Sequence, residues 1–162
     1  MTIFSCDWTS YLILSHDLYA RIKHEKYSKH TKENDIAIFE LAHPAELNEN
    51  VKIIPLASKN DHFVGKTCTV SGWGTKDDGG LAEKGLREAD VPVVSNEKCN
   101  AKISYDGEIF SKMMCAGYAK GGKDGCQGDS GGPLVCRNSQ DQNVLAGVVS
   151  WGRGKNLKKI SS

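Results

Sequence analysis

Residues 122–133 read GKDGCQGDSGGP, with Ser130 between Asp129 and a pair of glycines. A serine hydroxyl is a weak nucleophile at neutral pH and attacks a substrate only when a base stands beside it. The stretch therefore predicts a nucleophilic serine, with an ordinary turn serine as the plainer alternative. The first interpretation requires a base elsewhere in the chain.

Length and composition describe an ordinary globular chain. Its 162 residues suffice for one domain with a core, and 39% hydrophobic with 25% charged residues is typical of soluble proteins. A net charge of +1 gives no reason to expect nucleic acid or an anionic membrane as a partner. No apolar run approaches the roughly 20 residues of a membrane-spanning helix.

The six cysteines form no CxxC pair and have no histidine at zinc-site spacing, so we expect no metal and no cofactor. An even number of cysteines in a glycine-rich chain favours disulfides and an oxidising, extracellular compartment. The N-terminal stretch MTIFSCDWTSYLIL has no basic start and only a short apolar run, so it predicts no signal peptide.

Short Val- and Ile-rich runs separated by Gly, Asn and Asp clusters predict an all-β sandwich or barrel. The predicted strands are residues 51–56, 67–74, 89–95, 131–137 and 144–152.

Two further segments have a different character. Residues 95–103 predict a short helix with Ser95 or Asn96 as its N-cap. The tail, residues 155–162, is basic and polar without a strand pattern, so we expect a solvated end.

Five motifs, in this order along the chain, resemble the trypsin/chymotrypsin-like serine proteases: NDIAIFEL (34–41), CTVSGWG (68–74), LREADVPVVSNEKCN (86–100), CAGYAKGGKDGCQGDSGGPLVC (115–136) and VSWGRG (149–154). The resemblance covers residues 21–154. It leaves residues 1–20 as a leader unlike the family and 155–162 as a divergent tail.

The resemblance implies catalytic roles for four residues. Ser130 would be the nucleophile, and Asp35 the aspartate that orients the catalytic histidine. The backbone N–H groups of Gly128 and Ser130 would form the oxyanion hole. Asp129 would pair with the N-terminal amine created by activation cleavage.

The resemblance also implies a substrate site. Asp124 matches the aspartate at the base of the trypsin specificity pocket, which binds Arg or Lys side chains. Gln127 and the strand segment Ser150, Trp151 and Gly152 would line the same site. The plainer alternatives are a surface-loop aspartate at 124 and an ordinary strand end at 150–152.

Parts of the family pattern are absent. The family's base lies in a His-Cys motif, and none of the five histidines has that context; His24, eleven residues before Asp35, matches a different family position. The activation site is also missing, and Lys155 replaces a family cysteine that would bond Cys126. By resemblance the disulfides are Cys68–Cys136 and Cys99–Cys115, which leaves the state of Cys6 and Cys126 open.

The sequence thus predicts an incomplete double β-barrel, with the second barrel mostly present and the first mostly missing. We expect a trypsin-like serine endopeptidase by family, with the chain truncated and inactive alone. The alternatives are a non-catalytic binding isoform and a fragment without independent function. Expected partners are Arg/Lys-containing protein or peptide substrates and protease inhibitors.

Overall fold

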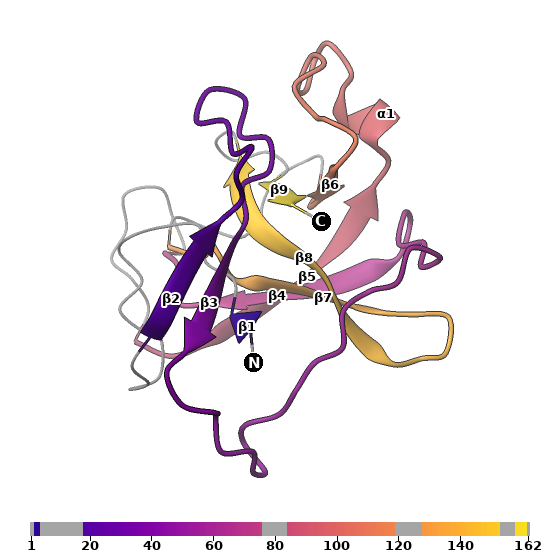
Figure 1. Cartoon of the computed structure of the whole chain (residues 1–162). Coiled ribbons are helices and arrows are strands. Elements are labelled where there is room, and N and C mark those ends of the chain that lie inside the picture. Colours follow the sequence, from indigo (N-terminus) through magenta and orange to yellow (C-terminus); the bar gives the residue numbers. More distant parts are fainter. Residues whose placement is uncertain (1, 4–17, 76–83, 119–127, 153–157, 162) are drawn as a thin grey trace.

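A computed structural model describes residues 2–3, 18–75, 84–118, 128–152 and 158–161. Nearly all of its regular structure is β-strand, in two units (Figure 1). The first is a three-stranded antiparallel sheet of order β1-β3-β2, with β1 at Thr2–Ile3, β2 at Leu18–Lys23 and β3 at Ala37–Leu41. The all-β prediction is confirmed.

The second unit is a closed six-stranded antiparallel barrel of order β4-β5-β6-β9-β8-β7. It closes because β4 pairs with both β5 and β7. Its strands are β4 (Thr67–Gly72), β5 (Arg87–Val94), β6 (Met113–Ala116), β7 (Pro133–Arg137), β8 (Asn143–Gly152) and β9 (Lys158–Ser161). One closed barrel beside a small sheet agrees with the predicted incomplete double barrel.

The barrel interior is filled by alternating residues of its strands. Val91 and Val93 of β5 and Leu134 and Cys136 of β7 are buried, while their neighbours in sequence are more exposed. This period of two is the pattern by which one face of a strand packs into a core. The disulfide Cys68–Cys136 joins β4 to β7 within this core.

A second buried cluster lies under the helix α1, at Asn96–Cys99. The Ser95 hydroxyl caps this helix by accepting a hydrogen bond from the Lys98 N–H at 3.3 Å. The predicted helix and cap are therefore present, although the helix ends at Cys99, earlier than expected. The disulfide Cys99–Cys115 connects α1 to β6, next to buried Tyr105.

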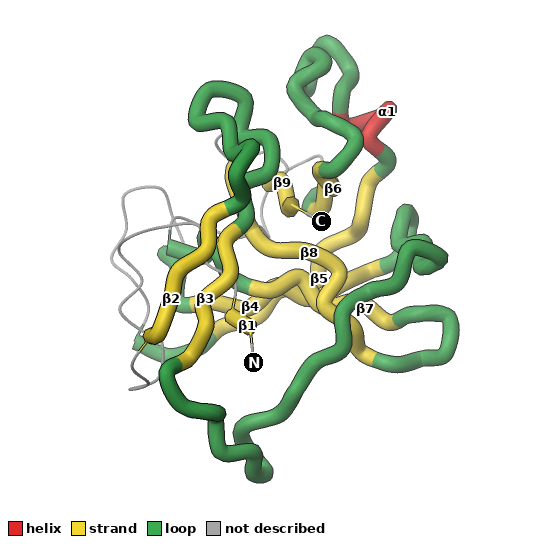
Figure 2. Tube along the Cα trace, in the orientation of Figure 1, coloured by secondary structure: helices red, strands yellow, loops and turns green. Residues whose placement is uncertain are grey.

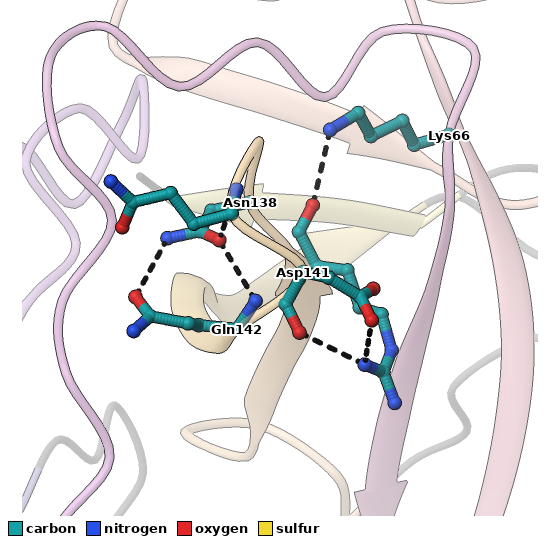
Figure 3. Close-up of polar contacts among 6 residues, drawn as sticks. Lys66, Asn138, Asp141 and Gln142 are labelled. Carbon is teal, nitrogen blue, oxygen red and sulfur yellow. Dashed lines mark hydrogen bonds and ion pairs between the residues drawn. The ribbon is translucent and has the colours of Figure 1, made fainter.

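Polar contacts stabilise the turn between β7 and β8 (Figure 3). The Asn138 side-chain oxygen accepts from the Gln142 N–H at 2.9 Å, and Lys66 donates to the Arg137 carbonyl at 3.1 Å. Arg137 also pairs with the Asp141 carboxylate at 3.0 Å. Because both side chains of this ion pair are exposed, it contributes at most about 1 kcal/mol.

Two sequence expectations were wrong. Residues 51–56 form no strand; only Leu56 makes an isolated bridge, to Leu145. Pro55 has no N–H to donate, and residues 52–56 are all exposed, so the segment has no face to bury. In the tail, Lys158–Ser161 forms β9, which pairs with both β6 and β8. Backbone pairing between two available strand edges outweighs the polar composition of that segment.

Candidate active site

The serine predicted as nucleophile lies in a tight turn before β7. The Gly132 N–H donates to the Asp129 carbonyl at 2.9 Å, which closes a four-residue turn with Ser130 second and Gly131 third. Gly131 has φ of 83°, as the third position of a type II turn requires. A glycine is favoured there because other residues rarely adopt positive φ. Ser130 is thus half-buried at a defined position of the turn.

Backbone contacts fix this turn to β8. The Gly131 N–H donates to the Val149 carbonyl at 2.8 Å, and the Val149 N–H donates to the Gly132 carbonyl at 2.9 Å. Since Val149 lies in a barrel strand, the orientation of Ser130 depends on the barrel and not on the loop alone.

The Asp129 carboxylate faces the end of β4. Its Oδ1 accepts a hydrogen bond from the Gly74 N–H at 2.8 Å. A Cβ atom on Gly74 would lie 2.5 Å from the same oxygen, so only glycine allows this approach. The half-buried carboxylate therefore has a backbone donor in this structure, and its pairing with an N-terminal amine remains a prediction.

Asp35 lies two residues before β3, and its carboxylate reaches across to the barrel. Its Oδ2 accepts a hydrogen bond from the Ser150 hydroxyl of β8 at 2.6 Å. An O–H donor to an ionised carboxylate makes a short and comparatively strong hydrogen bond. This contact fixes the Asp35 side chain against β8.

Strand β8 thereby joins the two predicted catalytic residues. Val149 holds the Ser130 turn, and its neighbour Ser150 holds Asp35. Ser130 and Asp35 are almost one hundred positions apart in sequence, yet the turn of the first and the side chain of the second bond to neighbouring residues of β8. The sequence prediction placed Ser150 only in substrate binding, and the structure adds a contact that positions Asp35.

Other predicted site residues lie nearby or outside the described residues. Trp151 is half-buried, with its ring edge-on to Tyr105 at a centroid distance of 6.0 Å, and Gly152 is exposed. Gly128 has φ of 102° and lies close to Gly74. The oxyanion-hole and substrate-binding roles stay predictions.

Asp124 and Gln127, with Cys6 and Cys126, lie outside the described residues.

A pocket of about 200 Å³ adjoins Asp35, lined also by His24, Asn34 and Lys112 among others. The His24 Nδ1 atom accepts a hydrogen bond from the Lys26 N–H at 3.2 Å, within its own turn. Lys112, which directly precedes β6 of the barrel, donates a hydrogen bond to the Asn34 side-chain oxygen at 3.4 Å. No contact in the described part of the chain assigns His24 to Ser130.

The described residues contain no group of three or more His, Cys, Asp or Glu side chains placed to hold a metal ion. No helix among them is long and apolar enough to span a bilayer.

The chain is similar in sequence to known serine proteases. The family model described as Trypsin matches residues 15–161. The chain is 45% identical over 133 residues to Trypsin of Squalus acanthias and 46% identical over 134 residues to Trypsin of Xenopus laevis, in each case across 82% of this chain. It is 40% identical over 137 residues, 83% of this chain, to Serine proteinase stubble of Drosophila melanogaster.

The matches cover only part of each relative: 55% and 52% of the two trypsins and 17% of the Drosophila protein. The chain thus spans about half the length of the trypsins that it matches. The matched family range, 15–161, includes every motif that suggested the resemblance. On these grounds the chain belongs to the trypsin family of serine proteases.

Proposed function

We propose that this chain carries the nucleophile and aspartate of an Arg/Lys-directed serine endopeptidase. We also propose that residues 1–162 are inactive alone, because no histidine of the sequence has the family's His-Cys context and none in the described residues is in contact with Ser130. The observation that carries the proposal is the double attachment at β8: Val149 to the Ser130 turn and Ser150 to Asp35. The attachment of both predicted residues to one strand supports their assignment as the nucleophile and the orienting carboxylate of a Ser-His-Asp site.

In the complete reaction, the Ser130 hydroxyl attacks the carbonyl carbon of the scissile peptide bond as the base removes its proton. The negative charge that develops on the carbonyl oxygen is stabilised by the N–H groups of Gly128 and Ser130. Asp35, held by Ser150, stabilises the protonated base and fixes its orientation. Without the base, turnover falls by about 10⁴- to 10⁶-fold.

Asp124 gives the proposal its substrate class. A carboxylate at the base of the pocket is left unpaired by an aromatic side chain and forms a charge-assisted hydrogen bond with a cationic one. Such a difference supports discrimination of about 10⁴- to 10⁵-fold. Partners are then proteins or peptides with Arg or Lys, and inhibitors that present the same side chains. The two disulfides support an extracellular location.

A hybrid tests the specificity. The region carrying the base, the activation site and the C-terminal segment is taken from a trypsin relative and joined to residues 21–154 of this chain. Fluorogenic peptides ending in Arg, Lys, Phe or Tyr are then compared by kcat/KM. We expect cleavage after Arg and Lys, and loss of most of it in Asp124→Ser.

Asp90→Ser is the matched control, since Asp90 is an exposed carboxylate on β5. It should leave the Arg/Lys preference unchanged. A hybrid that prefers Phe or Tyr would contradict the assignment of Asp124.

A further inference from the structure

The end of β2 and the loop that follows it concentrate the positive charge of the chain. Residues 21–32 contain five of the 21 Lys and Arg residues and only one of the 20 Asp and Glu residues, a net charge of +4. Since the whole chain has a net charge of +1, the other 150 residues carry −3. Such a separation of charge indicates a local surface for an anionic partner. The five cations, called the basic hairpin below, are Arg21, Lys23, Lys26, Lys29 and Lys32.

Hydrogen bonds hold the loop of the basic hairpin in a defined conformation, in which it projects beyond the ends of β2 and β3 (Figure 2). The Lys32 N–H donates to the Ser28 carbonyl at 2.7 Å. The Asn34 side-chain amide donates to the Lys26 carbonyl at 3.0 Å. Because the backbone that carries the lysines is already ordered, binding a partner costs less conformational entropy.

Three lysines of the basic hairpin are exposed and have no ionic partner among the described residues. These are Lys23, Lys26 and Lys29. The Glu33 carboxylate lies in the same loop, but it accepts a hydrogen bond from the Thr31 hydroxyl at 3.3 Å and lines the pocket near the candidate active site. An incoming anion can therefore pair with the three lysines without displacing a carboxylate of the described part of the chain.

The kind of anion follows from the extracellular location proposed above, on which this choice rests. Outside the cell, sulfated polysaccharides present closely spaced negative charges, and short Lys/Arg-rich segments are typical of surfaces that bind heparin. Nucleic acid fits this surface less well. The basic hairpin has no helix to enter a DNA groove, and Tyr27 is the only aromatic residue of segment 21–32, whereas sites for single strands stack successive bases on aromatic side chains.

We propose that the basic hairpin binds a linear sulfated polysaccharide. The lysine amino groups donate hydrogen bonds to the sulfate oxygens, and charge attraction supplies most of the affinity. The interaction is sensitive to salt, because the screening length falls from about 10 Å at 0.1 M to about 3 Å at 1 M ionic strength. None of the five cations has an assigned role in catalysis or in substrate binding, so this surface is separate from the candidate active site.

The test is the affinity of the folded, oxidised full chain for a heparin oligosaccharide of defined length, measured by titration calorimetry. We expect binding in 0.1 M NaCl and its loss in 1 M NaCl. The triple substitution Lys23→Gln/Lys26→Gln/Lys29→Gln should weaken binding about 10- to 100-fold, because each basic residue near an anionic surface contributes separately. Glu25→Gln removes the only carboxylate of segment 21–32 and should strengthen binding about two- to fivefold, a gain that misfolding does not produce.

The matched control is Lys59→Gln/Lys98→Gln/Lys102→Gln, which removes three exposed lysines elsewhere and leaves the same net charge as the first triple variant. It should bind heparin as the unaltered chain does. Equal losses in the two triple variants, or no binding by the unaltered chain in 0.1 M NaCl, would overturn the proposal. A single-stranded DNA of equal charge that bound as tightly as heparin would overturn the assignment to sulfated polysaccharides.

Discussion

The barrel and the three-stranded sheet are built from similar strands but differ in how they bury them. Every barrel strand pairs on both sides, and both described disulfides lie in this unit. In the sheet, the cross-strand neighbours Ile22 and Ile38 are 53% and 40% exposed. A strand contributes stability through what covers its faces, so the barrel should dominate the stability of this chain.

Removal of the disulfide Cys68–Cys136 should affect this comparison most. The double substitution Cys68→Ala/Cys136→Ala opens a loop with a sequence separation of 68 residues. From the entropy of the unfolded chain, we expect its loss to lower the free energy of unfolding by about 4 kcal/mol. Loss of Cys99–Cys115 should lower it by about 3 kcal/mol. Urea denaturation followed by tryptophan fluorescence measures both. A smaller loss for Cys68–Cys136 than for Cys99–Cys115 would contradict this order.

A pair of matched truncations compares the two units directly. Leu134 is fully buried in the barrel core, whereas Ile38 on β3 is 40% exposed. Leu134→Ala should destabilise by about 3 kcal/mol because it leaves a cavity, and Ile38→Ala by about 1 or less. Denaturation curves of the two variants give the difference. Equal losses would show that the sheet is packed as well as the barrel.

The contact between the units can be removed alone. Ser150→Ala deletes the hydroxyl that donates to Asp35 and should lower stability by about 1.5–2 kcal/mol, as expected for a hydrogen bond to a charged group. In this variant the backbone amide hydrogens of β3 should exchange faster with solvent, and those of β5 should change little. Ser139→Ala, at an exposed serine in the turn between β7 and β8, serves as the control. Uniform acceleration in both strands would mean that Ser150 supports the barrel itself.

Most of the barrel could be predicted from the sequence, because its longer strands combine Val and Ile with turn residues at both ends. β2, β6 and β9 gave too weak a local signal: Leu18–Lys23 is mixed in character, Met113–Ala116 has four residues, and Lys158–Ser161 is mainly polar. They are strands because partner edges are present, which no local pattern records. Residues 51–56 show the converse, since β-branched residues without a partner form no strand.

The candidate site likewise has one part that the sequence predicted and one part that it did not. The motifs located Ser130 and Asp35 and implied both disulfides. They gave no sign that Ser150 would hold Asp35 or that Gly74 would hold Asp129, because these pairs are separated by 115 and 55 residues. Such contacts depend on how β8 and β4 cross the barrel.

We propose that this chain holds the nucleophile and the aspartate of a serine protease site, and that none of its described histidines serves as the base that activates the serine. Labelling with an organophosphonate probe, read by mass spectrometry at Ser130, tests it most directly. Residues 1–162 alone should show no detectable labelling, while the hybrid that supplies the histidine should be labelled and its Ser130→Ala variant should not. Stoichiometric labelling of Ser130 in the chain alone would contradict the account.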